Sequence, residues 1–127
     1  MSSIPNDLKR FILTSVPSVP HLEAALMMHA QPGVGRTAAE VAARLYVPEQ
    51  VAIDLLQSLF AAGILKRDGE PSPRYRFEPG NPALDETLAA LAQAYADDLV
   101  GVTKLIHDAT QKNAQRFADA FKLRKDR

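Results

Sequence analysis

Three histidines, fifteen carboxylates and no cysteine define the chemistry that this 127-residue chain could perform. Without cysteine it has no thiolate metal ligand, no thiol nucleophile and no disulfide. No histidine has a partner at a spacing typical of a metal site; His107 and Asp108, for example, are adjacent and point apart on a helix. Asp97 and Asp98 fail as a catalytic acid–base pair for the same reason. We therefore expect no catalytic residue, no metal and no cofactor, and a protein that is not an enzyme.

Cationic side chains gather around one predicted hairpin. Residues 64–67 and 74–77 have the pattern of two short strands, with Tyr75 and Phe77 on one face and Arg74 and Arg76 on the other. Such a basic face suits phosphate groups, and it would equally be stable as an ordinary solvated surface. Between residues 36 and 77 the chain carries six basic and five acidic residues, a balance of +1. DNA-binding domains usually carry a clearer excess of positive charge.

Helices must position this hairpin. We expect a short helix within the lead residues 1–18 and a second helix over residues 19–30. Thr37 and Glu40 have the spacing of a capping box, which begins a helix that ends near residue 45. After a tight turn, Pro48 opens a longer helix that ends at Gly63.

One continuous helix is predicted over residues 83–110, because apolar residues recur there at intervals of three and four. Such a helix would be about 40 Å long, which is more than so small a domain needs for itself. We expect its apolar stripe to pair two subunits, the alternative being that the helix wraps its own domain. The residues assigned to dimerisation are Leu84, Leu88, Leu91, Tyr95, Leu99, Val102 and Ile106.

Charge is divided unevenly towards the end of the chain. Residues 83–110 carry five carboxylates against one lysine, whereas residues 112–127 carry six basic and two acidic residues. The preferred interpretation is that the basic amphipathic segment 112–127 folds against the acidic helix of its own chain or of a dimer mate. A second interpretation has it supply phosphate contacts. A third places it on a membrane surface, which its few apolar residues support less well.

The order helix, capped short helix, tight turn, longer helix and hairpin is that of a winged helix-turn-helix. It is carried by RTAAEVAARLYVPEQVAIDLLQSLFAAGILKRDGEPSPRYRF, Arg36 to Phe77. Within it, LLQSLFAAGIL followed by a basic hairpin is similar to the recognition-helix-to-wing passage of bacterial regulators of the MarR-like and ArsR-like type. The resemblance covers residues 19–78.

This resemblance implies a mainly α fold, with a two-stranded β wing and a long C-terminal dimerisation helix. Four segments follow: a lead helix in 1–18, a winged domain over 19–80, a long helix over 81–111 and the basic segment 112–127. The implied function is that of a homodimeric DNA-binding transcriptional regulator, with repression through promoter occupancy as its simplest form. With no apolar run long enough for a bilayer and no secretory signal pattern, we expect a cytoplasmic protein without membrane contact.

The resemblance also implies that the helix over residues 48–62 enters the major groove of double-stranded DNA. Gln50 and Gln57 could each bind adenine there, and Ile53 could contact a thymine methyl group. Glu49 and Asp54 lie on the same helix, which has no Lys or Arg, and carboxylates are unfavourable near phosphates. The residues assigned to DNA contact are Gln50, Ile53, Gln57, Arg36, Arg44, Arg67, Arg74 and Arg76.

A winged-helix adaptor that binds a protein partner is the competing hypothesis. Its interface would be the acidic, glutamine-bearing face of the same helix, since this fold also serves in protein interactions. The charge of that helix favours the adaptor. The order of the elements and the basic wing favour the DNA-binding regulator, which we prefer.

Overall fold

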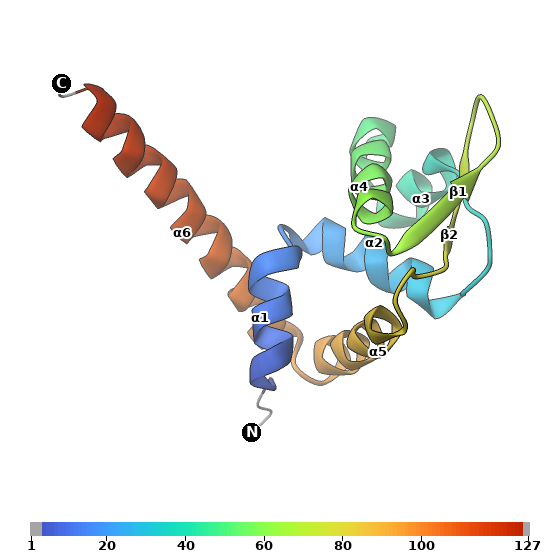
Figure 1. Ribbon diagram of the computed structural model, residues 1–127, viewed down its shortest axis with the longest axis horizontal. Coiled ribbons are helices and arrows are strands. Elements are labelled where there is room, and N and C mark those ends of the chain that lie inside the picture. Colours follow the sequence, from blue (N-terminus) through green and yellow to red (C-terminus); the bar gives the residue numbers. More distant parts are fainter. Residues whose placement is uncertain (1–3, 126–127) are drawn as a thin grey trace. The chain divides into compact units, whose positions relative to one another are not determined.

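The computed structural model describes residues 4–125, and side chains up to residue 112. The predicted basic segment 112–127 thus lies, apart from Lys112, outside the residues whose side chains are described. The elements are α1 (Asn6–Ser15), α2 (Val19–Ala30), α3 (Ala38–Leu45), α4 (Glu49–Ala61), β1 (Leu65–Asp68), β2 (Arg74–Phe77), α5 (Pro82–Asp97) and α6 (Leu99–Lys125) (Figure 1).

These elements form two units. The first, here called the winged unit, is Pro20–Gln93, and the second, the terminal unit, combines Met1–Val19 with Ala94–Arg127. The segment 81–111, predicted as one dimerisation element, is therefore divided between the two units. Within the winged unit, α3 and α4 pack against each other and α4 packs beside the β1–β2 hairpin (Figure 1).

Helix α3 begins at the predicted capping box, which the structure confirms. The amide of Glu40 donates to Thr37 Oγ1 over 3.3 Å, and the Thr37 amide donates to Glu40 Oε1 over 3.4 Å. Each side chain thus satisfies an amide that has no partner within the helix. The helix ends at Tyr46, whose backbone is left-handed with φ 57°. This residue forms the tight turn into α4.

Helix α4 ends at the predicted glycine stop. Gly63 has φ +81°, a region that a residue without Cβ enters at little cost. The amide of Gly63 donates to Phe60 O over 3.0 Å, and that of Ile64 donates to Leu59 O over 3.1 Å. This pair of hydrogen bonds is a Schellman motif, which satisfies the last carbonyls of the helix and directs the chain into β1.

The two-stranded antiparallel wing is also confirmed. Its register pairs Leu65 with Phe77, Lys66 with Arg76, Arg67 with Tyr75 and Asp68 with Arg74. Tyr75 and Phe77 face the core with 3% and 4% of their surfaces exposed, as their alternation predicts. On its other edge, β2 exchanges two 2.8 Å backbone hydrogen bonds between Tyr75 and Arg36. The wing is thereby fixed to the segment that precedes α3.

The core of the winged unit is apolar and comes from helices and wing alike. Its largest fully buried side chains are Leu22, Met28, Val41, Leu56, Leu59, Leu65, Leu88 and Leu91. A polar contact joins α5 to this core: His29 Nε2 lies 2.9 Å from Asp85 Oδ1, and the His29 ring meets Phe77 edge-on at 5.0 Å. The first three turns of α5 therefore belong with the winged unit.

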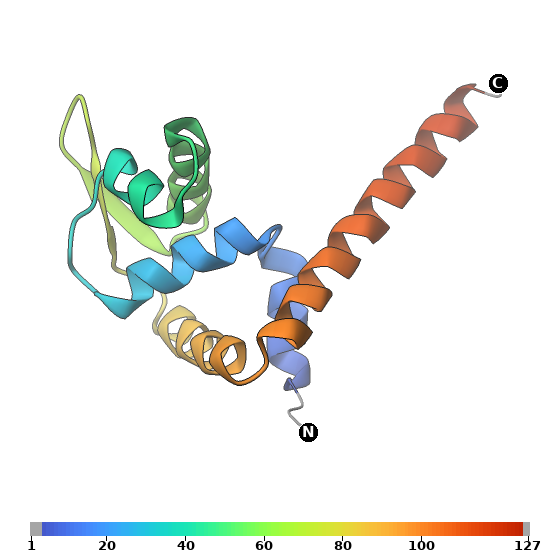
Figure 2. The ribbon, with the colours of Figure 1, turned by 180° about the vertical axis from the view of Figure 1, so that it is seen from behind.

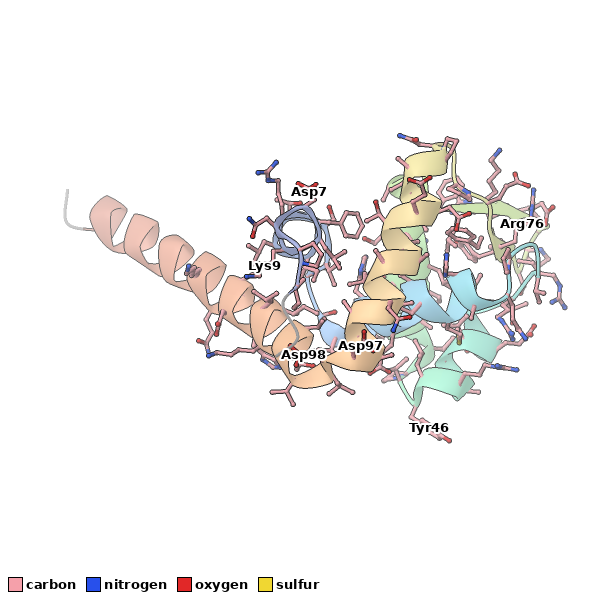
Figure 3. The ribbon with its side chains drawn as sticks, turned by 90° about the horizontal axis from the view of Figure 1, so that it is seen from below. Asp7, Lys9, Tyr46, Arg76, Asp97 and Asp98 are labelled. Carbon is pink, nitrogen blue, oxygen red and sulfur yellow. The ribbon has the colours of Figure 1, made fainter. Side chains whose placement is uncertain are left out.

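The prediction of one unbroken helix over residues 83–110 is wrong, because the chain breaks at Asp98. The Asp98 Oδ1 atom accepts the amide of Gly101 over 3.0 Å, which makes Asp98 the N-cap of a new helix. A Cβ atom at position 101 would overlap the Asp98 carboxylate as it is placed here, so a larger residue at this position would require the Asp98 side chain to move. Figure 3 shows Asp97 and Asp98 at this junction.

In the terminal unit, α1 packs along α6 (Figure 2). Leu8 and Ile12 of α1 are buried, as are Val102 and Ile106 of α6. Beyond the end of α1, Thr110 Oγ1 donates to the Pro17 carbonyl over 3.2 Å. The first three turns of α6 are thus covered on one side by α1 of the same chain.

This packing buries much of the apolar stripe that the sequence assigned to dimerisation. Four of the seven assigned residues, namely Leu88, Leu91, Val102 and Ile106, are buried within their own chain. Leu84 and Tyr95 are half-buried, and Leu99 is 54% exposed. Most of the stripe therefore serves the interior of one subunit, as the alternative interpretation of the sequence allowed.

Candidate nucleic-acid interface

The exposed face of α4 carries the residues predicted to contact bases. Gln50 and Gln57 are exposed, and Ile53 lies half-buried between them. The Gln50 side-chain amide donates from Nε2 to Asp54 Oδ1 over 3.0 Å, across one turn of the helix. This hydrogen bond fixes which end of the Gln50 amide faces Asp54, because a carboxylate can only accept.

A groove of about 480 Å³ lies between this face of α4 and the wing. Helix α4 contributes Glu49, Ile53 and Gln57, which follow one another at intervals of four residues. The remaining lining residues are Thr37, Ala38, Ala39, Arg67, Glu70, Pro71, Ser72, Pro73 and Tyr75. The groove thus brings together three residues predicted from the sequence: Ile53, Gln57 and Arg67.

Arg67 is held in this groove by aromatic side chains. Its guanidinium carbon lies 4.1 Å from the centroid of the Phe60 ring, a cation–π contact, and its Nη1 donates to the Tyr75 hydroxyl over 3.4 Å. Among the residues whose side chains are described, no carboxylate lies within ion-pair distance of Arg67. Its positive charge therefore remains available to an anion.

The other three cations of the wing are compensated. Arg76 Nη1 lies 3.0 Å from Asp68 Oδ2, and Lys66 Nζ lies 3.0 Å from Glu78 Oε2. The hydrogen bond and charge of Lys66, with the charge of Arg76, lower the pKa of Glu78. The outer face of the wing is thus an exposed network of paired charges, whereas the sequence predicts a free basic face.

Arg74 is paired across elements, with α3. Its Nη1 lies 3.2 Å from Glu40 Oε1, and it also donates to the Gly35 carbonyl over 3.4 Å. Hydrogen bonds from the Thr37 backbone and side chain, together with Arg74, lower the pKa of Glu40. One carboxylate therefore caps α3 and neutralises a wing arginine.

The two remaining predicted arginines lie apart from the groove. Arg36 is buried, with 6% of its surface exposed, and its guanidinium donates to the Gln31 side-chain oxygen. The backbone pairing with Tyr75 carries its side chain towards the interior, and this burial does not favour the predicted DNA contact. Arg44 is exposed in the last turn of α3.

Tyr46 is an exposed residue that the sequence did not single out. It lies in the turn between α3 and α4, is 95% exposed, and projects from that turn in Figure 3. A left-handed backbone is unfavourable for a residue with a side chain, and glycine is usual there. The signal in the sequence that could have identified it is an aromatic residue placed in the turn between two predicted helices.

Within the described residues, no three His, Asp or Glu side chains come together as a metal site would require. No single helix described here is long and apolar enough to cross a membrane; α1 and α2 pass such a test of length and composition only as a pair with a break between them.

No protein-family model matches the sequence, and no curated protein matches it either. Solved structures do. The homodimeric winged helix-turn-helix DNA-binding domain of a possible ArsR-family transcriptional regulator from Mycobacterium bovis is 17% identical, with a TM-score of 0.52 over 79% of this chain and 94% of that chain.

MepR, a transcription regulator of the Staphylococcus aureus multidrug efflux pump MepA, is 15% identical; its TM-score is 0.52 over 94% of this chain and 90% of that chain. A MarR family transcription regulator is 25% identical, with a TM-score of 0.50 over 91% of this chain and 82% of that chain. MepR has also been solved in complex with DNA. The chain accordingly has a winged helix-turn-helix fold, mainly α with a β wing, similar to that of MarR- and ArsR-family regulators.

Proposed function

We propose that the protein is a DNA-binding transcriptional regulator of winged-helix type that acts as a homodimer. The observation that carries this proposal is the groove between α4 and the wing, where the polar face of α4 lies beside the uncompensated Arg67. In such a fold, the helix supplies base contacts in the major groove and the wing supplies contacts to the backbone.

Each part of the surface then has a distinct role. Gln50 and Gln57 face the bases from α4, and Arg67 binds a phosphate of the strand that passes through the groove. Tyr46, at the N-terminal end of α4, offers its hydroxyl to the backbone. Arg74 and Arg76 contribute less than Arg67, because their charges are already paired.

The solved relatives support both parts of the proposal. The Mycobacterium bovis domain is homodimeric and DNA-binding, and MepR forms a DNA complex. Exposed apolar side chains in the terminal unit, Leu99 at 54% and Val100 at 75%, provide a surface that a second subunit would cover. A repressor of this kind acts in the cytoplasm and needs no enzymatic activity. The adaptor hypothesis has no comparable support.

Retention of genomic DNA fragments tests the proposal. Immobilised protein is mixed with sheared genomic DNA of its own organism, and the retained fragments are sequenced. The proposal predicts strong retention of a small set of fragments from promoter regions. Retention that follows fragment length alone, or no retention at low salt, would contradict it. The double variant Gln50→Ala with Gln57→Ala is the matched control, since it is expected to lose the preference and keep the fold.

A further inference from the structure

We propose that α4 selects the two bases that present an amino group in the major groove, adenine and cytosine, and makes no guanine contact. This inference rests on the proposed DNA-binding function and specifies which base edges the site prefers. It is carried by the chemistry of the exposed face of α4, which is rich in hydrogen-bond acceptors. From Glu49 to Ala61, the helix contains no Lys, Arg or His.

The exposed side chains that α4 directs towards the DNA form two neighbouring rows. Glu49 and Gln57, with the apolar Ile53 between them, line the groove beside the wing. Gln50 and Asp54, which are also four residues apart, form the next row and are joined by their 3.0 Å hydrogen bond. Two carboxylates and two amides therefore occupy the exposed part of the helix that faces the DNA in this fold.

The Gln50–Asp54 hydrogen bond orients both groups. Because Gln50 Nε2 is turned towards Asp54, its Oε1 and second N–H remain free for a base. This is the donor–acceptor pair that a glutamine uses to bind N7 and N6 of adenine. Asp54 keeps its second carboxylate oxygen, which can only accept. Asp54 is thus a positioning residue for Gln50 and an acceptor in its own right.

The major-groove edges of the bases decide what such a surface can bind. Adenine and cytosine present amino groups at N6 and N4, whereas guanine presents the acceptors N7 and O6 and thymine presents the acceptor O4. Guanine is bound in proteins chiefly by Arg or Lys, which α4 lacks. Carboxylates placed against guanine or thymine would meet another acceptor. The strand contacted by α4 should therefore be rich in adenine and cytosine.

The excess of acidic residues in the winged unit increases the share of binding that depends on the base sequence. Pro20–Gln93 contains six Lys and Arg residues against nine Asp and Glu residues. Attraction to phosphates, which is independent of sequence, is therefore weak in this unit. Correct amino-group contacts must account for a large share of its preference for one duplex over another.

Selection from duplexes with a randomised centre tests the inference. The wild-type protein is expected to enrich sites whose contacted strand carries adenine and cytosine. Asp54→Ala should lower the preference at its position by about tenfold, the usual value of a good base contact. It should bind unselected DNA as well as wild type or better, because a negative charge is removed. Glu23→Ala, an exposed carboxylate on α2, makes the same change in charge and should keep the preference.

Modified bases in the selected site provide a second measurement. Replacing a contacted adenine by unsubstituted purine, an analogue of adenine without the 6-amino group, should weaken binding by about tenfold. Replacing guanines by 7-deazaguanine should change nothing. Loss of binding with 7-deazaguanine, or an unchanged preference in Asp54→Ala, would overturn this inference and leave the proposed function standing. Failure of the wild type to enrich any sequence would overturn both.

Discussion

At the scale of single residues, the surroundings of each charge on the wing matter more than the number of charges. Lys66, Arg74 and Arg76 each have a carboxylate within 3.2 Å, whereas Arg67 rests on an aromatic ring. A phosphate that approached the paired cations would compete with carboxylates already in place. Arg67 has no ion-paired carboxylate to displace among the described side chains, and its guanidinium packs on the Phe60 ring.

Arg67→Ala should therefore weaken binding to every duplex by about tenfold, since a hydrogen bond to a charged group contributes roughly 1.5 kcal/mol. The slope of log affinity against log salt should fall by about one, as expected for the loss of a single phosphate contact. Arg76→Ala is the matched control, because Asp68 and Glu78 already compensate this arginine. Fluorescence anisotropy measures both. Equal losses in the two variants would contradict the role given to Arg67.

The buried side chain of His21 should make the free energy of unfolding depend on pH. It is 6% exposed, its Nε2 lies 3.4 Å from Ser58 Oγ, and burial lowers its pKa below the ordinary value of 6.5. Below that pH the unfolded chain binds a proton that the folded chain resists binding. The free energy of unfolding should thus fall as pH falls from about 6.5 towards the lowered pKa.

Urea unfolding across this pH range measures the effect. His21→Gln, which stays neutral and can still bond to Ser58, should lose less stability on acidification than the wild type. If the free energy of unfolding changed with pH by the same amount in His21→Gln and in the wild type, His21 would not be the cause of the pH dependence.

At the scale of elements, local signals predicted most of the winged unit. The capping box of Thr37 and Glu40, the stop at Gly63 and the alternation of Tyr75 and Phe77 each involve residues within a few positions of one another. Such signals act regardless of the rest of the chain, so the sequence was sufficient for them.

What the sequence did not predict came from features that local patterns do not contain. Arg36 is buried because it pairs with Tyr75, and Arg74 is neutralised by Glu40, in both cases more than thirty residues away in the sequence. The break at Asp98 was hidden for another reason. Apolar spacing continues from Tyr95 to Leu99 and Val102 across the break, so periodicity alone favoured one helix.

Asp98→Ala should destabilise the protein by about 1 kcal/mol, because the first turn of α6 loses its N-cap. Asp98→Asn, which keeps an acceptor oxygen at the same place, should be nearly neutral. Chemical denaturation compares the two variants. If Asp98→Ala were as stable as the wild type, the hydrogen bond to Gly101 would have no capping role.

At the scale of the whole molecule, a DNA-binding homodimer needs a surface on which two subunits meet. Most of the apolar stripe is buried within one chain, which leaves Leu99 and Val100 as the exposed apolar residues at the start of α6. We expect a second copy to cover this pair of exposed aliphatic side chains.

Leu99→Glu combined with Val100→Glu should convert a dimer, of twice 13.9 kDa, into a monomer. Both positions lie in the first turn of α6, where carboxylates favour the helix, so the fold should survive. Light scattering after size-exclusion chromatography gives the mass. A variant that stays dimeric would place the interface elsewhere, and a monomeric wild type would contradict the homodimer itself.

Sequence-specific DNA binding can be measured by fluorescence anisotropy with the duplex from upstream of the protein's own gene and a scrambled duplex of equal composition. The titration is repeated from about 50 to 200 mM salt, the range over which phosphate contacts weaken strongly. We expect tighter binding to the upstream duplex at every salt concentration. Equal and weak binding to both duplexes, lost by physiological salt, would contradict it.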